Sequence, residues 1–178
     1  MTDIAADRAR LLEIVKDKAI VHGRVTLSSG AEADYYVDLR RITLDGEASP
    51  LVGRVMLDLV ADLDFDAVGG LTLGADPVAT SMLHATAAKG ERLDAFVVRK
   101  AAKDHGMKRR IEGPDIVGKN VVVLEDTSTT GGSPLEGSRS ISRIATRSGP
   151  TWILRLPRIG PVVTRISVRA GTSAMITL

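Results

Sequence analysis

A buried-strand pattern passes directly into a polar, glycine-rich loop near residue 125. Residues 121–124 are Val-Val-Val-Leu, and the carboxylates Glu125 and Asp126 follow them. Four hydroxyl residues and two glycines come next: Thr127, Ser128, Thr129, Thr130, Gly131 and Gly132. Four aliphatic residues in a row are typical of a central strand in a parallel sheet. The run therefore predicts a strand whose carboxyl end carries two acids and an anion-binding loop.

These residue types suit a sugar phosphate. Carboxylates accept hydrogen bonds from paired ribose hydroxyls, while backbone N–H groups and the hydroxyls of residues 127–130 can converge on a phosphate. Gly131 and Gly132 let the backbone come close to the ligand. Acids at strand ends are often merely solvated, but the contiguity of acids, hydroxyls and glycines favours a binding site.

Predicted helices and strands alternate along the chain. Hydrophobic periodicity predicts strands at 67–71, 93–98 and 121–124, and helices at 4–15, 51–63 and 77–89. Thr2 or Asp3 is expected to cap the first helix, and Pro50 to precede the second. Such alternation is typical of an α/β fold, in which helices cover a parallel sheet and the ligand binds at the carboxyl ends of the strands.

The thirteen residues from Val121 to Ser133 resemble the donor signature of the type I phosphoribosyltransferases. The resemblance implies a parallel sheet flanked by helices, with a small N-terminal hood. It also implies that Glu125 and Asp126 hold the 2′- and 3′-hydroxyls of phosphoribosyl pyrophosphate, and that residues 127–132 wrap its 5′-phosphate. The signature identifies the shared donor and not the base.

A cationic segment after the strand at 93–98 looks like the mobile catalytic loop of orotate phosphoribosyltransferases. It contains Arg99, Lys100, Lys103 and His105 and ends at Gly106. A solvated loop is the ordinary alternative, but three cationic groups and an imidazole within seven residues suit an anionic leaving group. The resemblance implies that these four side chains approach the pyrophosphate and act in catalysis, together with Asp126.

The segment 23–41 is also similar to the orotate enzymes, in which the equivalent aromatic stretch lines the pyrimidine pocket. It holds both tyrosines of the chain, Tyr35 and Tyr36, and also Arg40, and the resemblance implies that these residues contact substrate. One of the two tyrosines is expected to be an ordinary strand residue, because successive side chains point to opposite faces.

The turn within residues 68–77, a strand followed by a Gly/Asp loop and a helix, matches a pyrophosphate-facing turn of the same enzymes. The resemblance thus spans about residues 20–133. It departs from the family where many members carry lysines, at Ser28 or Ser29 and at Leu73. Fewer side-chain contacts to pyrophosphate are therefore expected.

The implied activity is transfer of a phosphoribosyl group to orotate, which gives orotidine 5′-monophosphate and pyrophosphate in pyrimidine biosynthesis. The resemblance also implies Mg²⁺ bound mainly through the substrate, with no metal ligands of the protein's own, and a homodimer whose catalytic loop serves the neighbouring subunit. Two alternatives stay open: a nucleic-acid-binding regulator built on this fold, and a phosphoribosyltransferase for a purine or uracil.

Composition limits the setting of the protein. The chain has no cysteine, which suits a reducing cytoplasm, and His22, His84 and His105 lack metal-ligand spacing. No apolar run approaches the roughly 18 residues needed to span a bilayer, and no signal peptide is apparent. We expect a cytoplasmic enzyme with small-molecule substrates and neither a membrane nor a nucleic-acid partner.

Residues 137–178 differ from the rest of the chain. They contain seven arginines, no lysine and no acid, whereas residues 1–136 contain 22 acidic and 17 basic residues. A basic tail can bind nucleic acid non-specifically, but the family's later strand, its Asp-Arg base-pocket pair and its closing helix are not found here. We therefore interpret residues 1–178 as one phosphoribosyltransferase domain whose tail, possibly irregular, arises from a shifted reading frame or another non-homologous terminus.

Overall fold

The computed structural model describes residues 3–26, 32–100, 110–126, 151–155, 164–166 and 173–177, the last three ranges by their backbone alone. Its helical elements are α1 (Ile4–Ile14), the π-helix η1 (Val15–Ala19), α2 (Arg40–Thr43), α3 (Ala48–Leu59) and α4 (Ala75–Ala87). Its strands are β1 (Ile20–Thr26), β2 (Glu32–Val37), β3 (Ala67–Leu71), β4 (Asp94–Val98), β5 (Ile111–Glu112), β6 (Val121–Glu125), β7 (Thr151–Arg155), β8 (Thr164–Ile166) and β9 (Ser173–Thr177). Among the helices in these ranges, none is long and apolar enough to cross a membrane.

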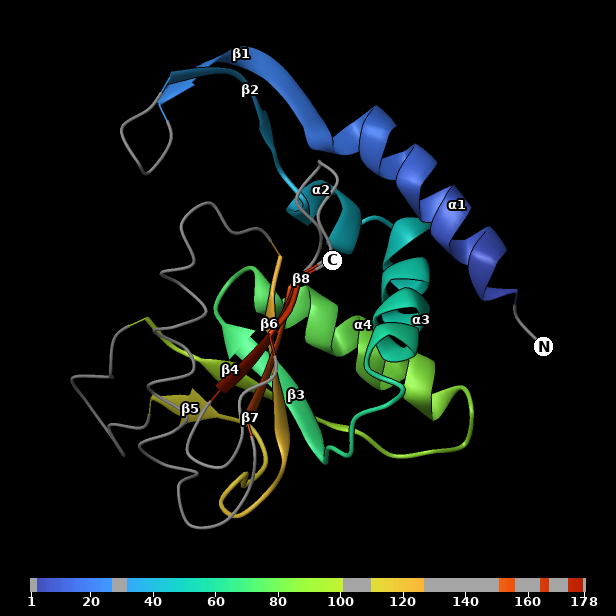
Figure 1. The fold of residues 1–178 in the computed structure, drawn as a ribbon, viewed down its shortest axis with the longest axis vertical. Helices are drawn as coiled ribbons and strands as arrows, with labels where there is room; N and C mark the ends of the chain where they lie inside the picture. Colours follow the sequence, from blue (N-terminus) through green and yellow to red (C-terminus); the bar gives the residue numbers. More distant parts are fainter. Residues whose placement is uncertain are drawn as a thin grey trace.

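The main sheet has the strand order β5-β4-β3-β6-β7-β9-β8. Neighbouring strands from β4 to β9 pair in parallel, and the two short edge strands β5 and β8 pair antiparallel. Every residue of β3 and β6 is buried, as expected of central strands that are apolar except for Glu125 at the end of β6. The predicted α/β fold with a parallel sheet is confirmed (Figure 1).

Two hydrophobic clusters cover the two faces of this sheet. One cluster joins Val68, Val122 and Leu124 to residues of α1, α3 and α4. The other lies on the opposite face and includes Phe96 and Val123. The alternation along each strand divides the side chains between the two clusters, so the strands are fixed in register from both sides.

Glycine lets α4 approach the centre of the sheet. A Cβ atom added at Gly70 would lie 2.7 Å from the Cβ of Ala75, at the start of α4. Any side chain at this position would therefore push α4 away from β3. The close approach places the first turn of α4 directly beyond the carboxyl end of β3.

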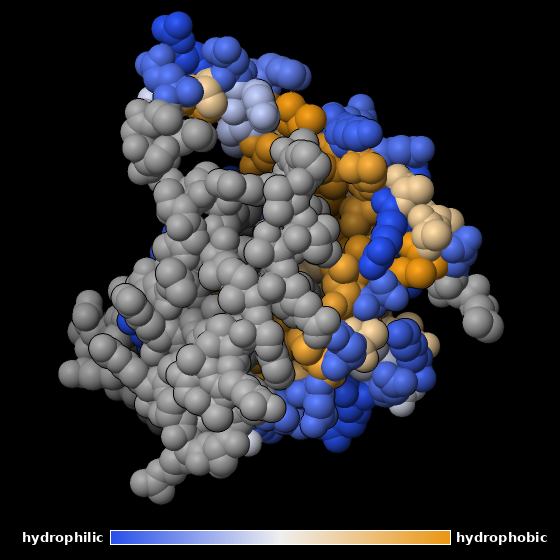
Figure 2. Space-filling model, in the orientation of Figure 1, coloured by the Kyte–Doolittle hydropathy of each residue, from blue (hydrophilic) through white to orange (hydrophobic). Residues whose placement is uncertain are grey.

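A small hood precedes the main sheet. Strands β1 and β2 form a separate two-stranded antiparallel sheet that projects from the body of the molecule (Figure 1). Hydrophobic residues gather along the inner side of α1 and over α3, whereas the described residues at the outer end of β1 and β2 are mostly hydrophilic (Figure 2). The hood implied by the sequence is present, and β2 leads directly to α2 at the sheet's carboxyl edge.

Helix boundaries differ from the predictions by a few residues. Helix α3 begins at Ala48, two residues before Pro50, and α4 begins at Ala75, two residues before Pro77. Proline is tolerated in a first helical turn because the N–H that it lacks has no partner there. Asp3, one of the two expected caps, accepts hydrogen bonds from the backbone N–H groups of the first turn of α1.

The tail contributes strands to the sheet. Strand β7 extends the sheet in parallel from β6, and β9 in turn pairs with β7 and with β8. The tail, for which the sequence suggests an irregular structure, contains three strand segments. They lie at its aliphatic and β-branched stretches, whose residue types favour strands.

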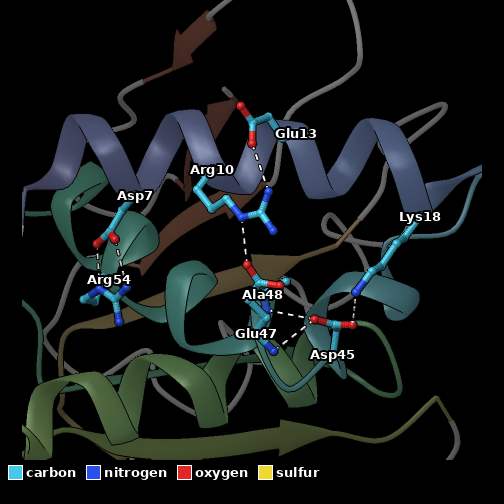
Figure 3. A network of polar contacts seen from close by, with 8 residues as sticks. All are labelled: Asp7, Arg10, Glu13, Lys18, Asp45, Glu47, Ala48 and Arg54. Carbon is cyan, nitrogen blue, oxygen red and sulfur yellow. Dashed lines mark hydrogen bonds and ion pairs between the residues drawn. The ribbon is translucent and has the colours of Figure 1, made fainter.

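Ion pairs fasten α1 and η1 to the start and body of α3 (Figure 3). Asp7 accepts hydrogen bonds from Nε and Nη2 of Arg54 at 2.6 and 2.8 Å, and the side chain of Asp7 is only 10% exposed. The hydrogen bond from Arg54 holds the pKa of Asp7 below its usual range. Lys18, 2.6 Å from Asp45, is the main reason that the pKa of Asp45 falls to about 2.

Asp7→Asn should lower the free energy of unfolding by about 2 kcal/mol at pH 7, because it leaves a partly buried guanidinium without its charged partner. Since folding lowers the pKa of Asp7, this stabilisation is complete above the unfolded-state pKa of about 3.9 and disappears as the pH falls through the lower folded-state value. The wild-type advantage in urea unfolding should therefore shrink at pH 3.

Asp58→Asn is the matched control. Asp58 also lies 2.6 Å from an arginine, Arg8, but these two side chains are 40% and 49% exposed. Exposed pairs contribute less than about 1 kcal/mol. Equal losses for the two variants, or a loss at Asp7 that does not change with pH, would contradict the importance of burial at the Asp7–Arg54 pair.

Candidate active site

A cleft of about 260 Å³ opens at the carboxyl edge of the parallel strands. Four segments line it: the end of β2 with the start of α2, the loop 71–74 between β3 and α4, the residue Lys100 after β4, and the end of β6. The carboxyl ends of parallel strands meet at one edge of a sheet, so residues far apart in the sequence converge there.

The cleft brings together five of the residues singled out from the sequence. These residues come from three segments: the end of β2 with the start of α2, the cationic segment after β4, and the end of β6. They are Tyr36, Arg40, Lys100, Glu125 and Asp126. The carboxylates of the last two are nearly buried, each residue being 8% exposed, which is an unusual position for two adjacent acids without a binding role.

Two other candidates do not line this cleft. Tyr35 is 49% exposed and stands opposite His22 in the hood, so it is the tyrosine that alternation places away from Tyr36. Arg99 lies 3.8 Å from Glu112 on β5. Lys103, His105 and the loop Thr127, Ser128, Thr129, Thr130, Gly131 and Gly132 lie outside the described residues. The roles inferred for all of these residues stay predictions.

Asp38 is a cleft residue that the sequence reading did not single out. Its Oδ1 accepts hydrogen bonds from Nε of Arg40 at 2.8 Å and from the backbone N–H of Arg40 at 3.2 Å. The hydrogen bond from Arg40 lowers the pKa of Asp38, and Asp38 in turn raises the pKa of Arg40. An aspartate two residues before an arginine at a turn was the available signal. Asp38 thus fixes the guanidinium of Arg40 at the cleft.

The loop between β3 and α4 is held at both of its ends. The backbone N–H of Thr72 donates to the carbonyl of Val98 at 2.9 Å, and its hydroxyl donates to Oδ2 of Asp76 at 2.6 Å. The Thr72–Leu73 peptide bond is cis. Gly74 lines the cleft and immediately precedes α4, whose N-terminus carries a partial positive charge. This loop is the turn that the sequence predicted to face an anion.

The base of the cationic segment is closed by hydrogen bonds. The backbone N–H of Arg99 donates to the carbonyl of Arg110 at 2.8 Å, and Nε of Arg110 donates back to the carbonyl of Arg99 at 3.1 Å. Strands β4 and β5 pair antiparallel on either side of this contact. The closure fixes Lys100 beside the end of β4, where it lines the cleft.

The cleft therefore contains both negatively and positively charged side chains. Glu125 and Asp126 can accept hydrogen bonds from hydroxyls, while Arg40 and Lys100 can contact anionic groups. Within the described ranges, no group of three or more His, Cys, Asp or Glu residues could hold a metal ion. The arrangement suits a small molecule that combines neighbouring hydroxyls with phosphates.

The chain is similar to solved and curated orotate phosphoribosyltransferases. It is 73% identical to the enzyme of Streptomyces coelicolor over 141 residues, which are 79% of this chain and 76% of that protein. A crystal structure of the Mycobacterium tuberculosis H37Rv enzyme in complex with Fe(III) dicitrate matches with a TM-score of 0.73 and 55% identity, over 85% of this chain and 83% of that one.

A crystal structure of the Mycobacterium tuberculosis enzyme in complex with 5-phospho-alpha-D-ribosyl 1-diphosphate matches with a TM-score of 0.68 and 48% identity, over 84% of this chain and 83% of that chain. No protein-family model matches the chain.

Proposed function

Because the chain belongs to the orotate phosphoribosyltransferase family, we propose that its cleft binds 5-phosphoribosyl 1-pyrophosphate and orotate and converts them into orotidine 5′-monophosphate and pyrophosphate. This is a glycosyl transfer of pyrimidine biosynthesis. The observation that carries the proposal is the meeting of Glu125 and Asp126 with Lys100 and Arg40 in one cleft.

The donor is held through its hydroxyls and its phosphates. Glu125 and Asp126 accept hydrogen bonds from the ribose hydroxyls, which is supported by their nearly buried position at the end of β6. Residues 127–132 wrap the 5′-phosphate. The turn at 72–74 and the start of α4 face the pyrophosphate, supported by the helix N-terminus at that edge of the cleft.

Orotate enters beside the hood. Tyr36 provides an aromatic surface for the pyrimidine, and Arg40 contacts its carboxylate, since Asp38 fixes the guanidinium at the cleft. In the reaction the bond from the anomeric carbon to the pyrophosphate oxygen breaks, and a bond from that carbon to a ring nitrogen of orotate forms. Positive charge develops on the ribose, and the leaving pyrophosphate gains negative charge.

The cationic segment neutralises the leaving group. Arg99, Lys100, Lys103 and His105 close over the pyrophosphate and exclude water, which would otherwise hydrolyse the donor. The position of Lys100 at the cleft supports this role. Hydrogen bonds between Arg99 and Arg110 fix the two ends of this segment.

Mg²⁺ fits this site as a substrate-bound cation. The carboxylates of Asp38, Glu125 and Asp126 are hard oxygen donors of the kind that Mg²⁺ prefers, although they form no metal-binding group by themselves in the described part of the chain. When bound together with the substrate, the ion would supply charge neutralisation to the leaving group.

The assembly we propose is a homodimer in the cytoplasm, in which the cationic segment of each subunit serves the site of its partner. A regulatory, nucleic-acid-binding function is disfavoured, because relatives of this identity carry the name of the enzyme and because Lys100 lines the cleft where a leaving group would sit. Uracil and purine specificity are disfavoured by the cationic Arg40, which suits an anionic base.

Incubation with donor, Mg²⁺ and each base in turn tests the proposal. Orotate absorbance should fall only when donor and Mg²⁺ are both present, whereas adenine, hypoxanthine and uracil should give no product. A thermal melt of the same sample shows that the protein is folded. Folded protein that leaves orotate unchanged would contradict the proposed function.

Lys103→Ala should lower kcat by at least about a hundredfold and change the Kd of the donor little, because its charge acts mainly on the departing pyrophosphate. If the loop acts on the neighbouring subunit, mixing inactive Lys103→Ala and Asp126→Asn variants should restore up to about a quarter of the wild-type activity, in dimers that keep one intact site. An unchanged kcat would refute the role of Lys103, and no recovery in demonstrated mixed dimers would refute the sharing of loops.

The arginine-rich tail is best explained by a shifted reading frame within one domain. Supporting this, the Streptomyces coelicolor relative matches 141 residues of a chain of 178, which leaves a length close to that of the tail unmatched. Resequencing the gene and translating its other two frames beyond codon 136 should yield a family-like segment with acids and lysines. If neither frame yields one, the frame-shift proposal is wrong.

A further inference from the structure

The end of β6 and the loop before α4 touch through a glycine. A Cβ atom added at Gly74 would lie 2.6 Å from Cγ of Asp126 and 3.0 Å from its Oδ2, and closer still to its Oδ1. Ordinary contacts of a Cβ atom begin at about 3.4 Å. The Asp126 carboxylate therefore packs directly against the backbone at Gly74, and any side chain at this position would displace it.

The carboxylate is the part that would give way. The loop that holds Gly74 is pinned at Thr72 by hydrogen bonds to Val98 and Asp76, and it leads straight into α4. Helix α4 already packs closely on β3, because a Cβ atom added at Gly70 in β3 would clash with Ala75 at the start of α4. The helix therefore cannot shift toward β3 to make room. Asp126, by contrast, meets Gly74 with the end of its side chain, which can rotate where a backbone cannot.

We infer that Gly74 is a positioning residue. Because it has no side chain, the backbone of the loop between β3 and α4 can hold the Asp126 carboxylate in one orientation. In that orientation the carboxylate accepts hydrogen bonds from the ribose of the donor. The inference rests on the proposed function, since it assumes that a ribose occupies the cleft. It also links two parts of the site, because the loop expected to face pyrophosphate sets the geometry of the acid expected to hold the sugar.

Gly74→Ala tests the inference, with Gly46→Ala as the matched control. A Cβ atom at Gly46 would have no heavy atom within 4 Å, and the residue is not in the left-handed region. Gly74→Ala should lower kcat/KM for the donor by at least about tenfold, since small misplacements of a positioning group are costly. The KM for orotate and the melting temperature should change little, and Gly46→Ala should stay within about twofold of wild type.

A crystal structure of Gly74→Ala should show the Asp126 carboxylate turned away from its wild-type position. Wild-type kinetics as for Gly46→Ala, or an unmoved carboxylate, would overturn the inference. An inactive but folded wild type would instead overturn the proposed function. Gly74→Ala could fail to fold while the double variant Gly74→Ala/Asp126→Ala folds, and this result would support the contact between position 74 and Asp126. If neither variant folds, Gly74 is structural and the inference is wrong.

Discussion

The parallel pairing of β3 with β4 and β6 is the constraint on which the rest of this structure depends. It brings residues 71–74, Lys100 and the Glu125–Asp126 pair to one edge, although they are separated by many residues in the sequence. The pairing is held by buried apolar side chains on both faces of the sheet. Gly70 of β3 lets α4 lie close enough for its N-terminus to join the same edge. The site is thus a consequence of how the sheet packs.

The sequence predicted this arrangement well where local chemistry determines it. The all-apolar runs at 67–71 and 121–124 could only be central strands, and their carboxyl ends had to meet. The prediction was less accurate where a residue is compatible with two contexts. From the sequence, Pro50 and Pro77 suggest helix boundaries, yet both fit within a first turn. Strand alternation could show that one tyrosine leaves the site, but only the residues that line the cleft show that it is Tyr35.

Contacts between distant loops were beyond prediction from one sequence. Asp38 precedes Arg40 at a turn and Gly74 lies in the predicted anion-facing turn, but their contacts at the cleft follow from tertiary packing. Asp38 matters because it orients Arg40, and Gly74 matters because it leaves space for Asp126. In both cases an inconspicuous residue sets the orientation of a charged group that the sequence did single out. A residue that positions another is recognised only when the contact is seen.

The balance of charge in the cleft explains why the acids and the cations sit on different kinds of segment. Among the described residues that line the cleft are three carboxylates, Asp38, Glu125 and Asp126, and two cations, Arg40 and Lys100. A donor that carries several negative charges would be repelled by such a cleft alone. Binding therefore requires further positive charge, which Mg²⁺ arriving with the donor and the remainder of the cationic segment would supply. In the proposed reaction, the acids at the end of β6 would hold the sugar, and Mg²⁺ would arrive with the donor and leave with the product.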